Sequence, residues 1–216
     1  MAVIAGLAVV GEYFSFRYFN VKVLVLLIAI LMMLEWIWTV FGVMAKPFWK
    51  RDNKQKTKLP VWRFLMGFAG IAYFLFIFIP AANSVGGRPW IILLLLMIIS
   101  LADIGAFFFG RWLGGDKMWE RISNGKTWSG QIAGIICGTF AGVMYGLLGT
   151  DMFLPQLMWI GIGVALLSQY GDLTASWVKR KIGIKDFGHT LPGHGGLLDR
   201  FDGWIYVLPI IWLVML

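Results

Sequence analysis

The chain has 216 residues, of which 59% are hydrophobic and only 14% are charged, and its mean hydropathy is +0.78. An average soluble domain carries roughly 25% charged residues, so this composition excludes a water-soluble globular fold and predicts an integral membrane protein. Nineteen Lys and Arg residues against eleven Asp and Glu residues give a net charge of +8. In a membrane protein such an excess is typical of basic loops on one side of the bilayer, so we expect no nucleic-acid partner.

Apolar runs recur along the chain, and a membrane-spanning helix needs about 20 such residues. The predicted spans, in chain order, cover residues 2–16, 23–45, 64–80, 89–110, 130–149, 152–170 and a last segment that starts near Leu197 and ends at residue 216. We therefore predict an all-α integral membrane protein, a polytopic bundle of about seven transmembrane helices. It forms a single membrane domain over residues 1–216, with N-terminal helices in 1–100 and a catalytic part in 101–216.

Basic residues concentrate in three of the predicted loops. Residues 46–63 hold seven Lys or Arg, residues 111–126 hold four, and residues 179–200 hold five. With the spans above, these loops lie on the same side of the bilayer, and the positive-inside rule places that side in the cytoplasm. We expect a protein of a bacterial-type inner membrane whose active-site loops are cytoplasmic.

Three carboxylates fall inside predicted spans: Glu12, Glu35 and Asp103. An ionisable residue in the hydrocarbon is costly and is therefore a functional candidate. We expect Asp103 to line a polar cavity, and Glu12 and Glu35 to pair with buried basic or backbone groups. The single cysteine, Cys137, excludes a disulfide framework and is expected to serve in packing.

The last predicted loop is chemically richer than a simple connection. From Asp172 to Asp202 it holds four Asp, five Lys or Arg, two His and a Pro-Gly-His-Gly-Gly turn. Carboxylates bind Mg²⁺, Lys and Arg bind phosphate oxygens, and glycines let backbone N–H groups approach anions. Asp199 and Asp202 are three residues apart and would share one face of the helix that begins the last span. Asp172 would end the sixth span, because Gly171 interrupts the apolar run, although an Asp at a helix N-terminus is also an ordinary cap.

At this point the sequence resembles a known family. Residues 176–202 read S-W-V-K-R-x4-K-D-F-G-H-T-L-P-G-H-G-G-L-L-D-R-F-D, which resembles the signature of the CDP-diacylglycerol synthases, also called phosphatidate cytidylyltransferases. Residues 122–128 (I-S-N-G-K-T-W) are similar to the family's Ser-Pro-x-Lys-Thr-Trp loop, and residues 102–110, Gly171-Asp-Leu and Glu35-Trp also match family segments. The chain departs from the family pattern at Asn124, Ser129 and Ala175.

The resemblance implies transfer of a cytidylyl group from CTP to phosphatidic acid, which gives CDP-diacylglycerol and pyrophosphate. It implies Mg²⁺ as cofactor, with a monovalent cation such as K⁺ as a second candidate. The expected partners are CTP, phosphatidic acid, membrane lipids and, by the same resemblance, a second copy of the chain. Two alternatives stay open: a related CTP-dependent enzyme that acts on an isoprenoid or ether lipid phosphate or a polyprenol, and a lipid transporter or scramblase.

The resemblance also assigns roles to individual residues. Asp172 and Asp199 match metal-binding aspartates, and Asp202 is expected to orient them or to be a further ligand. Lys126, with Ser123 and Thr127, is expected to hold the phosphates of CTP, so Asp172, Asp199 and Lys126 are the catalytic candidates. The remaining substrate-binding candidates are Lys179, Arg180, His194, Gly195, Gly196, Arg200 and Asp103.

Overall fold

The computed structural model describes residues 21–44, 61–119, 123–148, 153–188, 190 and 195–215. Helices dominate these ranges, and they follow one another along the chain as α2 (Val21–Met44), α3 (Val61–Tyr73), a π-helical turn η3 (Phe74–Phe78), α4 (Ile79–Gly86), α5 (Pro89–Leu113), α6 (Trp128–Leu147), α7 (Leu154–Ile182) and α8 (Trp204–Val214). A small antiparallel hairpin of β1 (Lys117–Trp119) and β2 (Ser123–Thr127) connects α5 to α6. The all-helical prediction did not include this hairpin.

Four helical segments are long and apolar enough to cross a bilayer: Val21–Val40, Phe64–Gly86, Pro89–Leu113 and Trp128–Leu147. They coincide with the predicted spans at 23–45, 64–80, 89–110 and 130–149, and the chain is accordingly an integral membrane protein. The total of about seven spans stays a prediction, because α7 is not among these four, α8 has 11 residues, and the predicted span at 2–16 lies outside the described residues.

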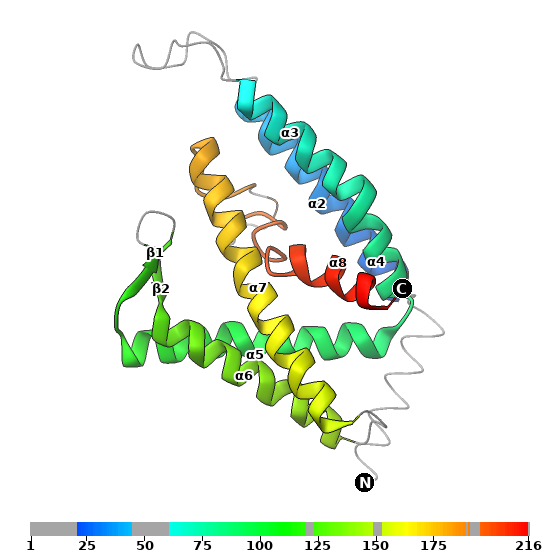
Figure 1. The fold of residues 1–216 in the computed structure, drawn as a ribbon. Helices are drawn as coiled ribbons and strands as arrows, with labels where there is room; N and C mark the ends of the chain where they lie inside the picture. Colours follow the sequence, from blue (N-terminus) through cyan, green and yellow to red (C-terminus); the bar gives the residue numbers. More distant parts are fainter. Residues whose placement is uncertain are drawn as a thin grey trace.

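The helices form two groups, which Figure 1 shows meeting around the segment between α7 and α8. In one group α5 and α6 lie side by side and α7 crosses them, whereas α2, α3, α4 and α8 form the other. Helices in a bilayer associate without a hydrophobic driving force, so their contact surfaces favour small residues that allow close packing. On α6 these are five buried glycines spaced four apart: Gly130, Gly134, Gly138, Gly142 and Gly146. A Cβ at Gly142 would lie 2.8 Å from the Leu157 carbonyl oxygen of α7, so these glycines allow close backbone approach.

Two prolines, Pro80 and Pro209, interrupt the helical hydrogen bonding of the second group of helices. Pro80 cannot continue a regular ladder of helical hydrogen bonds, and the π-helical turn η3 immediately precedes the short α4 that contains it. Pro209 lies inside α8 and cannot donate to the carbonyl of Ile205. The hydroxyl of Tyr73 on α3 donates to that carbonyl instead, which satisfies a backbone group that the bilayer could not hydrate.

The structure corrects two predictions about helix ends. Helix α7 does not end at Gly171 but continues to Ile182, so Asp172 lies within the helix. Helix α8 begins at Trp204 rather than near Leu197. Asp199 and Asp202 therefore lie in turns before α8 and not on one face of a helix.

Candidate active site

A pocket of about 330 Å³ lies between α5, α6, α7 and strand β2. Polar side chains from all four elements line it: Asp103, Gln131, Gln169, Asp172, Lys126 and Thr127. Asp103, which was expected to line a polar cavity, is thus one of the residues that line this pocket. Ser123, at the first residue of β2, is half-buried and is not among the residues that line this pocket.

Lys126 and Asp172 form an ion pair across the pocket, with 2.5 Å between Lys126 Nζ and Asp172 Oδ2. Their side chains are 23% and 40% exposed, so solvent and ligands can reach both. The other oxygen of Asp172 accepts a 3.4 Å hydrogen bond from Ser176 Oγ, one turn further along α7. Lys126 and Asp172 therefore neutralise each other, and because both are partly exposed, either side chain can bind a ligand in place of the other.

Thr127 has a structural task in addition to its predicted role. It is the N-cap of α6, and its Oγ1 accepts a 3.1 Å hydrogen bond from the N–H of Gly130. The same hydroxyl lies 3.0 Å from Ser129 Oγ. N-capping by a threonine side chain fixes the direction in which the helix starts, and this direction brings the preceding Lys126 to the pocket.

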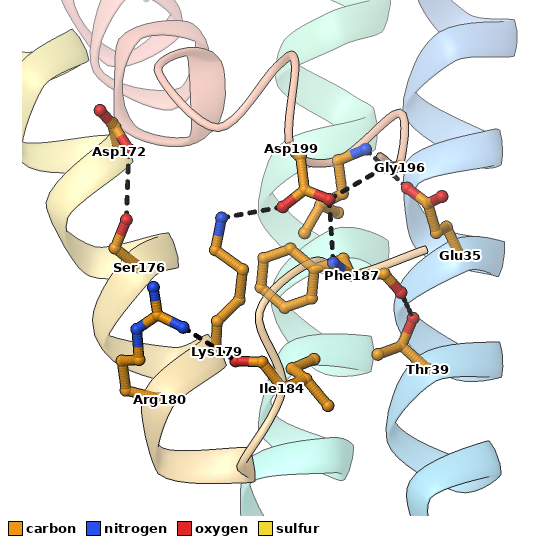
Figure 2. A network of polar contacts seen from close by, with 11 residues as sticks. Glu35, Thr39, Asp172, Ser176, Lys179, Arg180, Ile184, Phe187, Gly196 and Asp199 are labelled. Carbon is orange, nitrogen blue, oxygen red and sulfur yellow. Dashed lines mark hydrogen bonds and ion pairs between the residues drawn. The ribbon is translucent and has the colours of Figure 1, made fainter. Parts of the chain in front are cut away.

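Asp199 lies in the segment between α7 and α8 and has both carboxylate oxygens occupied, as Figure 2 shows. Its Oδ1 is 2.8 Å from Lys179 Nζ of α7. Its Oδ2 accepts hydrogen bonds from the backbone N–H groups of Phe187, at 2.9 Å, and Gly196, at 3.0 Å. The side chains of Lys179 and Asp199 are only 11% and 10% exposed. Asp199 thus ties two parts of this segment to each other and to α7.

The other predicted cations differ in their surroundings. The Lys179 ammonium also lies 5.4 Å from the ring centre of Phe187, so both ion pairing and the aromatic ring hold it in place. Arg180, one residue on, is exposed, and its Nη1 donates a 3.5 Å hydrogen bond to the carbonyl of Ile184. Arg200 is also exposed. Within the described chain, Arg180 and Arg200 are thus the predicted substrate-binding cations that face solvent.

Gly171 brings Asp172 of α7 close to the turn before α8. A Cβ at Gly171 would lie 2.5 Å from the backbone oxygen of Asp202 and 3.2 Å from Gly203 Cα, so only glycine allows this approach. Burial, and next the nearby charge of Asp172, raise the pKa of Asp202 to about 8, whereas Lys179 and Lys126 act in the opposite direction. Asp202 consequently lies within electrostatic reach of both ion pairs.

This donor set fits a hard divalent cation by its chemistry. Mg²⁺ is usually held by one or two carboxylates together with water and substrate phosphates, and the pocket residue Asp172 follows Gly171, which packs closely against the backbone of Asp202. Over the described ranges, no three His, Cys, Asp or Glu side chains form a ready-made metal cluster. Asp199 would have to exchange Lys179 or a backbone N–H for the metal, so its assignment as a ligand stays a prediction.

Glu35 of α2 connects this helix to the segment between α7 and α8. Its carboxyl is buried, its Oε2 accepts a 2.6 Å hydrogen bond from the backbone N–H of Leu198, and its Oε1 accepts one from Thr190 Oγ1. The expectation that Glu35 pairs with a backbone group is confirmed. Three residues were missed: Thr39, whose hydroxyl donates to the carbonyl of Phe187, and the pocket glutamines Gln131 and Gln169. No sequence pattern distinguishes them from ordinary polar residues of a helix.

Several predicted residues lie outside the described ranges: Glu12, His194 and the basic residues at 46–60. The two signature glycines of the predicted site are described. Gly195 has a φ of +82°, which favours glycine, and Gly196 donates to Asp199. The packing role predicted for Cys137 agrees with its contact with α5, since a Cβ at Gly105 would lie 2.5 Å from its sulfur.

Comparisons with known proteins agree on one family. A sequence model of the cytidylyltransferase family matches residues 1–216. The phosphatidate cytidylyltransferases of Staphylococcus saprophyticus and Staphylococcus haemolyticus are 40% identical over 126 residues, which are 58% of this chain and 48% of each relative. The Staphylococcus aureus protein of the same name is 39% identical over the same length. The chain spans about half the length of the curated relatives that it matches.

Proposed function

Because the chain belongs to the cytidylyltransferase family, we propose that it is a phosphatidate cytidylyltransferase that converts CTP and phosphatidic acid to CDP-diacylglycerol and pyrophosphate. The observation that supports this most strongly is the Lys126–Asp172 ion pair in a pocket that also contains Asp103. Two anionic substrates have to meet, and this pocket offers them an exchangeable cation. The names of the relatives supply the substrate class, and phospholipid synthesis is the corresponding process.

In the proposed reaction, a phosphate oxygen of phosphatidic acid attacks the α-phosphorus of CTP. The bond between that phosphorus and the bridging oxygen to the β-phosphate breaks, and pyrophosphate leaves with the electron pair. Such transfers depend on positioning and on charge stabilisation more than on covalent help from the protein. Lys126 would bind phosphate oxygens of CTP, and the exposed Arg180 and Arg200 would neutralise the nucleotide or the lipid headgroup.

We propose Mg²⁺ as the cofactor, with Asp172 and Asp202 as its carboxylate ligands and Asp199 as a further candidate. When bound, the cation would supply positive charge to the phosphate oxygens at which negative charge develops. The residues of this chain have the task of keeping the carboxylates close together, and the approach of Gly171 to the turn before α8 supports this. A monovalent cation such as K⁺ and a homodimer, both implied by the family resemblance, stay predictions.

The proposal is tested by product analysis. Purified protein in detergent–lipid micelles is incubated with CTP labelled in the α-phosphate, phosphatidic acid and Mg²⁺, and the label is followed into the lipid phase. Recovery of CDP-diacylglycerol supports the proposal. Label transfer only with an isoprenoid phosphate, an ether lipid phosphate or a polyprenol as acceptor would replace it with the related activity, and no transfer to any acceptor would reject it.

Lys126→Ala should lower kcat/KM for CTP about 10- to 100-fold, because a hydrogen bond to a charged group is lost. The ion pair with Asp172 is partly exposed, so the unfolding temperature should change little. Steady-state kinetics at varied CTP concentration measure the effect. Lys185→Ala, an exposed lysine beyond α7, is the matched control and should behave as wild type. Equal kinetics for the two variants would contradict the assignment of Lys126.

The proposed topology puts the loops beside the pocket in the cytoplasm of a bacterial-type inner membrane. In a Cys137→Ser background, a cysteine at Asp116 or Lys185, both exposed, should react with a membrane-impermeant thiol reagent only after the cells are opened. A cysteine at Phe153, at the opposite end of α6 and α7, should react in intact cells. Labelling of Asp116→Cys or Lys185→Cys from outside would overturn the orientation.

A further inference from the structure

The segment between α7 and α8, residues 183–203, is held from two sides by helices that are far apart in the sequence. On one side, Lys179 of α7 binds the Asp199 carboxylate. On the other side, α2 contacts the same segment through Glu35 and Thr39, which lie one helical turn apart (Figure 2). Asp199, which the resemblance assigns as catalytic, thus lies in a segment whose conformation depends partly on contacts with α2.

Glu35 lies at the centre of this contact. Glu35 is only 8% exposed, and its carboxyl accepts hydrogen bonds from the N–H of Leu198, the residue next to Asp199, and from the hydroxyl of Thr190. The Thr190 hydroxyl in turn accepts a 3.4 Å hydrogen bond from the N–H of Leu197. One side chain of α2 therefore organises the backbone on the N-terminal side of Asp199.

Two signature glycines pack directly against the same carboxyl. A Cβ at Gly196 would lie 2.6 Å from Glu35 Oε1, and one at Gly188 would lie even closer to that oxygen. Neither glycine has a positive φ, so it is the closeness of Glu35, and not the backbone conformation, that leaves little room for a side chain here. The glycines let the loop backbone close around the carboxyl group from two directions.

Thr39 and Trp36 of α2 contact the same segment at a second place, around Phe187. The hydroxyl of Thr39 donates to the carbonyl of Phe187, whose N–H donates to Asp199 Oδ2. Trp36 lies 5.6 Å, centre to centre, from the Phe187 ring. Both backbone donors of Asp199, Phe187 and Gly196, therefore lie in stretches that α2 contacts directly.

From this geometry we propose that Glu35 is a positioning residue for cytidylyl transfer. It fixes the loop so that Asp199 remains oriented between Lys179 and the two backbone N–H groups. Glu35 does not contact the pocket that holds Lys126 and Asp172, so it acts through Asp199 and not on a substrate. This inference rests on the proposed function, which supplies the reaction that the positioned residue serves.

Cytidylyl transfer tolerates little displacement of the groups that position the substrates. Transfer between two bound substrates needs reacting groups in near-attack geometry, and a shift of about 1 Å can cost roughly 100-fold in rate. Removal of the Glu35 carboxyl leaves the N–H of Leu198, a residue that is only 1% exposed, without this acceptor. The loop would then rearrange to find another acceptor, and Asp199 would move with it.

The test compares three variants: Glu35→Ala, which removes both acceptors; Glu35→Gln, which keeps one carbonyl oxygen and the side-chain length; and Ile98→Ala. Ile98 of α5 is fully buried and is packed near Gly138 of α6, so its truncation lowers stability away from the loop. For each variant, kcat and KM are measured with CTP and phosphatidic acid. Hydrogen–deuterium exchange of peptides that cover residues 195–200 is measured on the same samples.

For Glu35→Ala we expect a loss in kcat of roughly 100-fold with a much smaller change in either KM. Exchange at 195–200 should become at least about tenfold faster, since the N–H of Leu198 loses its hydrogen-bond acceptor. Glu35→Gln should restore most of kcat, and Ile98→Ala should lower the unfolding temperature without either change. Wild-type kcat in Glu35→Ala, an equal kcat loss in Ile98→Ala, or a Gln variant as impaired as the Ala variant would overturn the inference.

The outcomes also separate this inference from the proposed function. If the wild-type protein does not transfer a cytidylyl group to phosphatidic acid, the proposed function is rejected. The positioning role is then rejected too, regardless of the hydrogen–deuterium exchange measured at 195–200. An active wild-type protein whose Glu35→Ala variant keeps full kcat rejects the positioning role alone.

Discussion

Asp172→Asn is expected to abolish cytidylyl transfer while leaving the free energy of unfolding within about 1 kcal/mol of wild type, because an exposed ion pair contributes little to stability. The side chain is 40% exposed and lines the pocket with Lys126. Asparagine keeps its shape but lacks the negative charge that a hard cation needs. Turnover as a function of Mg²⁺ concentration, together with denaturant unfolding in detergent, measures both effects.

Asp186→Asn is the matched control for this prediction, because Asp186 is an exposed carboxylate in the segment that follows α7. It should keep most of the activity and the same dependence on Mg²⁺. If Asp172→Asn also keeps wild-type activity and metal dependence, the carboxylate serves only to pair with Lys126, and the proposed metal site is misplaced.

Asp199→Asn should differ from Asp172→Asn by losing stability as well as activity. The Lys179–Asp199 pair is about nine-tenths buried, and removing one partner of a buried pair costs about 3–5 kcal/mol because the other charge stays uncompensated. We therefore expect unfolding of Asp199→Asn at a clearly lower denaturant concentration, and near-complete loss of turnover.

The double variant Asp199→Asn/Lys179→Met separates the two effects. Methionine removes the unpaired ammonium but keeps much of the apolar stem of the lysine, so the double variant should recover a large part of the lost stability without recovering turnover. A single Asp199→Asn variant that is as stable as wild type would show that the pair is hydrated in solution and would remove the basis of this prediction.

Apolar run length predicted four of the spans well, because the bilayer imposes a minimum length that composition reports directly. The family resemblance assigned Lys126 and Asp172 to the substrate and metal site, and Asp103 was expected to line a polar cavity; the three residues line one pocket. Run length and motif are both read from the sequence itself, so neither requires knowledge of which helices are neighbours.

The errors arose where tertiary contacts override local signals. Gly171 interrupts the apolar run, which suggested that the span ends there, yet α7 continues through it, and the turn at Asp202 and Gly203 lies where a side chain would otherwise project. The hairpin has strands of three and five residues and no apolar alternation that could announce it. The contact of Glu35 with Leu198 joins residues that no periodicity relates.

The hydrogen bond between Glu35 and Leu198 spans 163 residues of sequence, which sets a delay during biosynthesis. At a translation rate of about 5–20 residues per second, roughly 8–30 s pass between synthesis of α2 and that of its partner segment. Through this interval α2 has to reside in or near the bilayer with a carboxyl group that lacks its final donors. The other residues of α2 are strongly apolar, and the span has a mean hydropathy of 2.5. Their favourable insertion free energy keeps the helix in the bilayer until the partner segment of Glu35 has been synthesised.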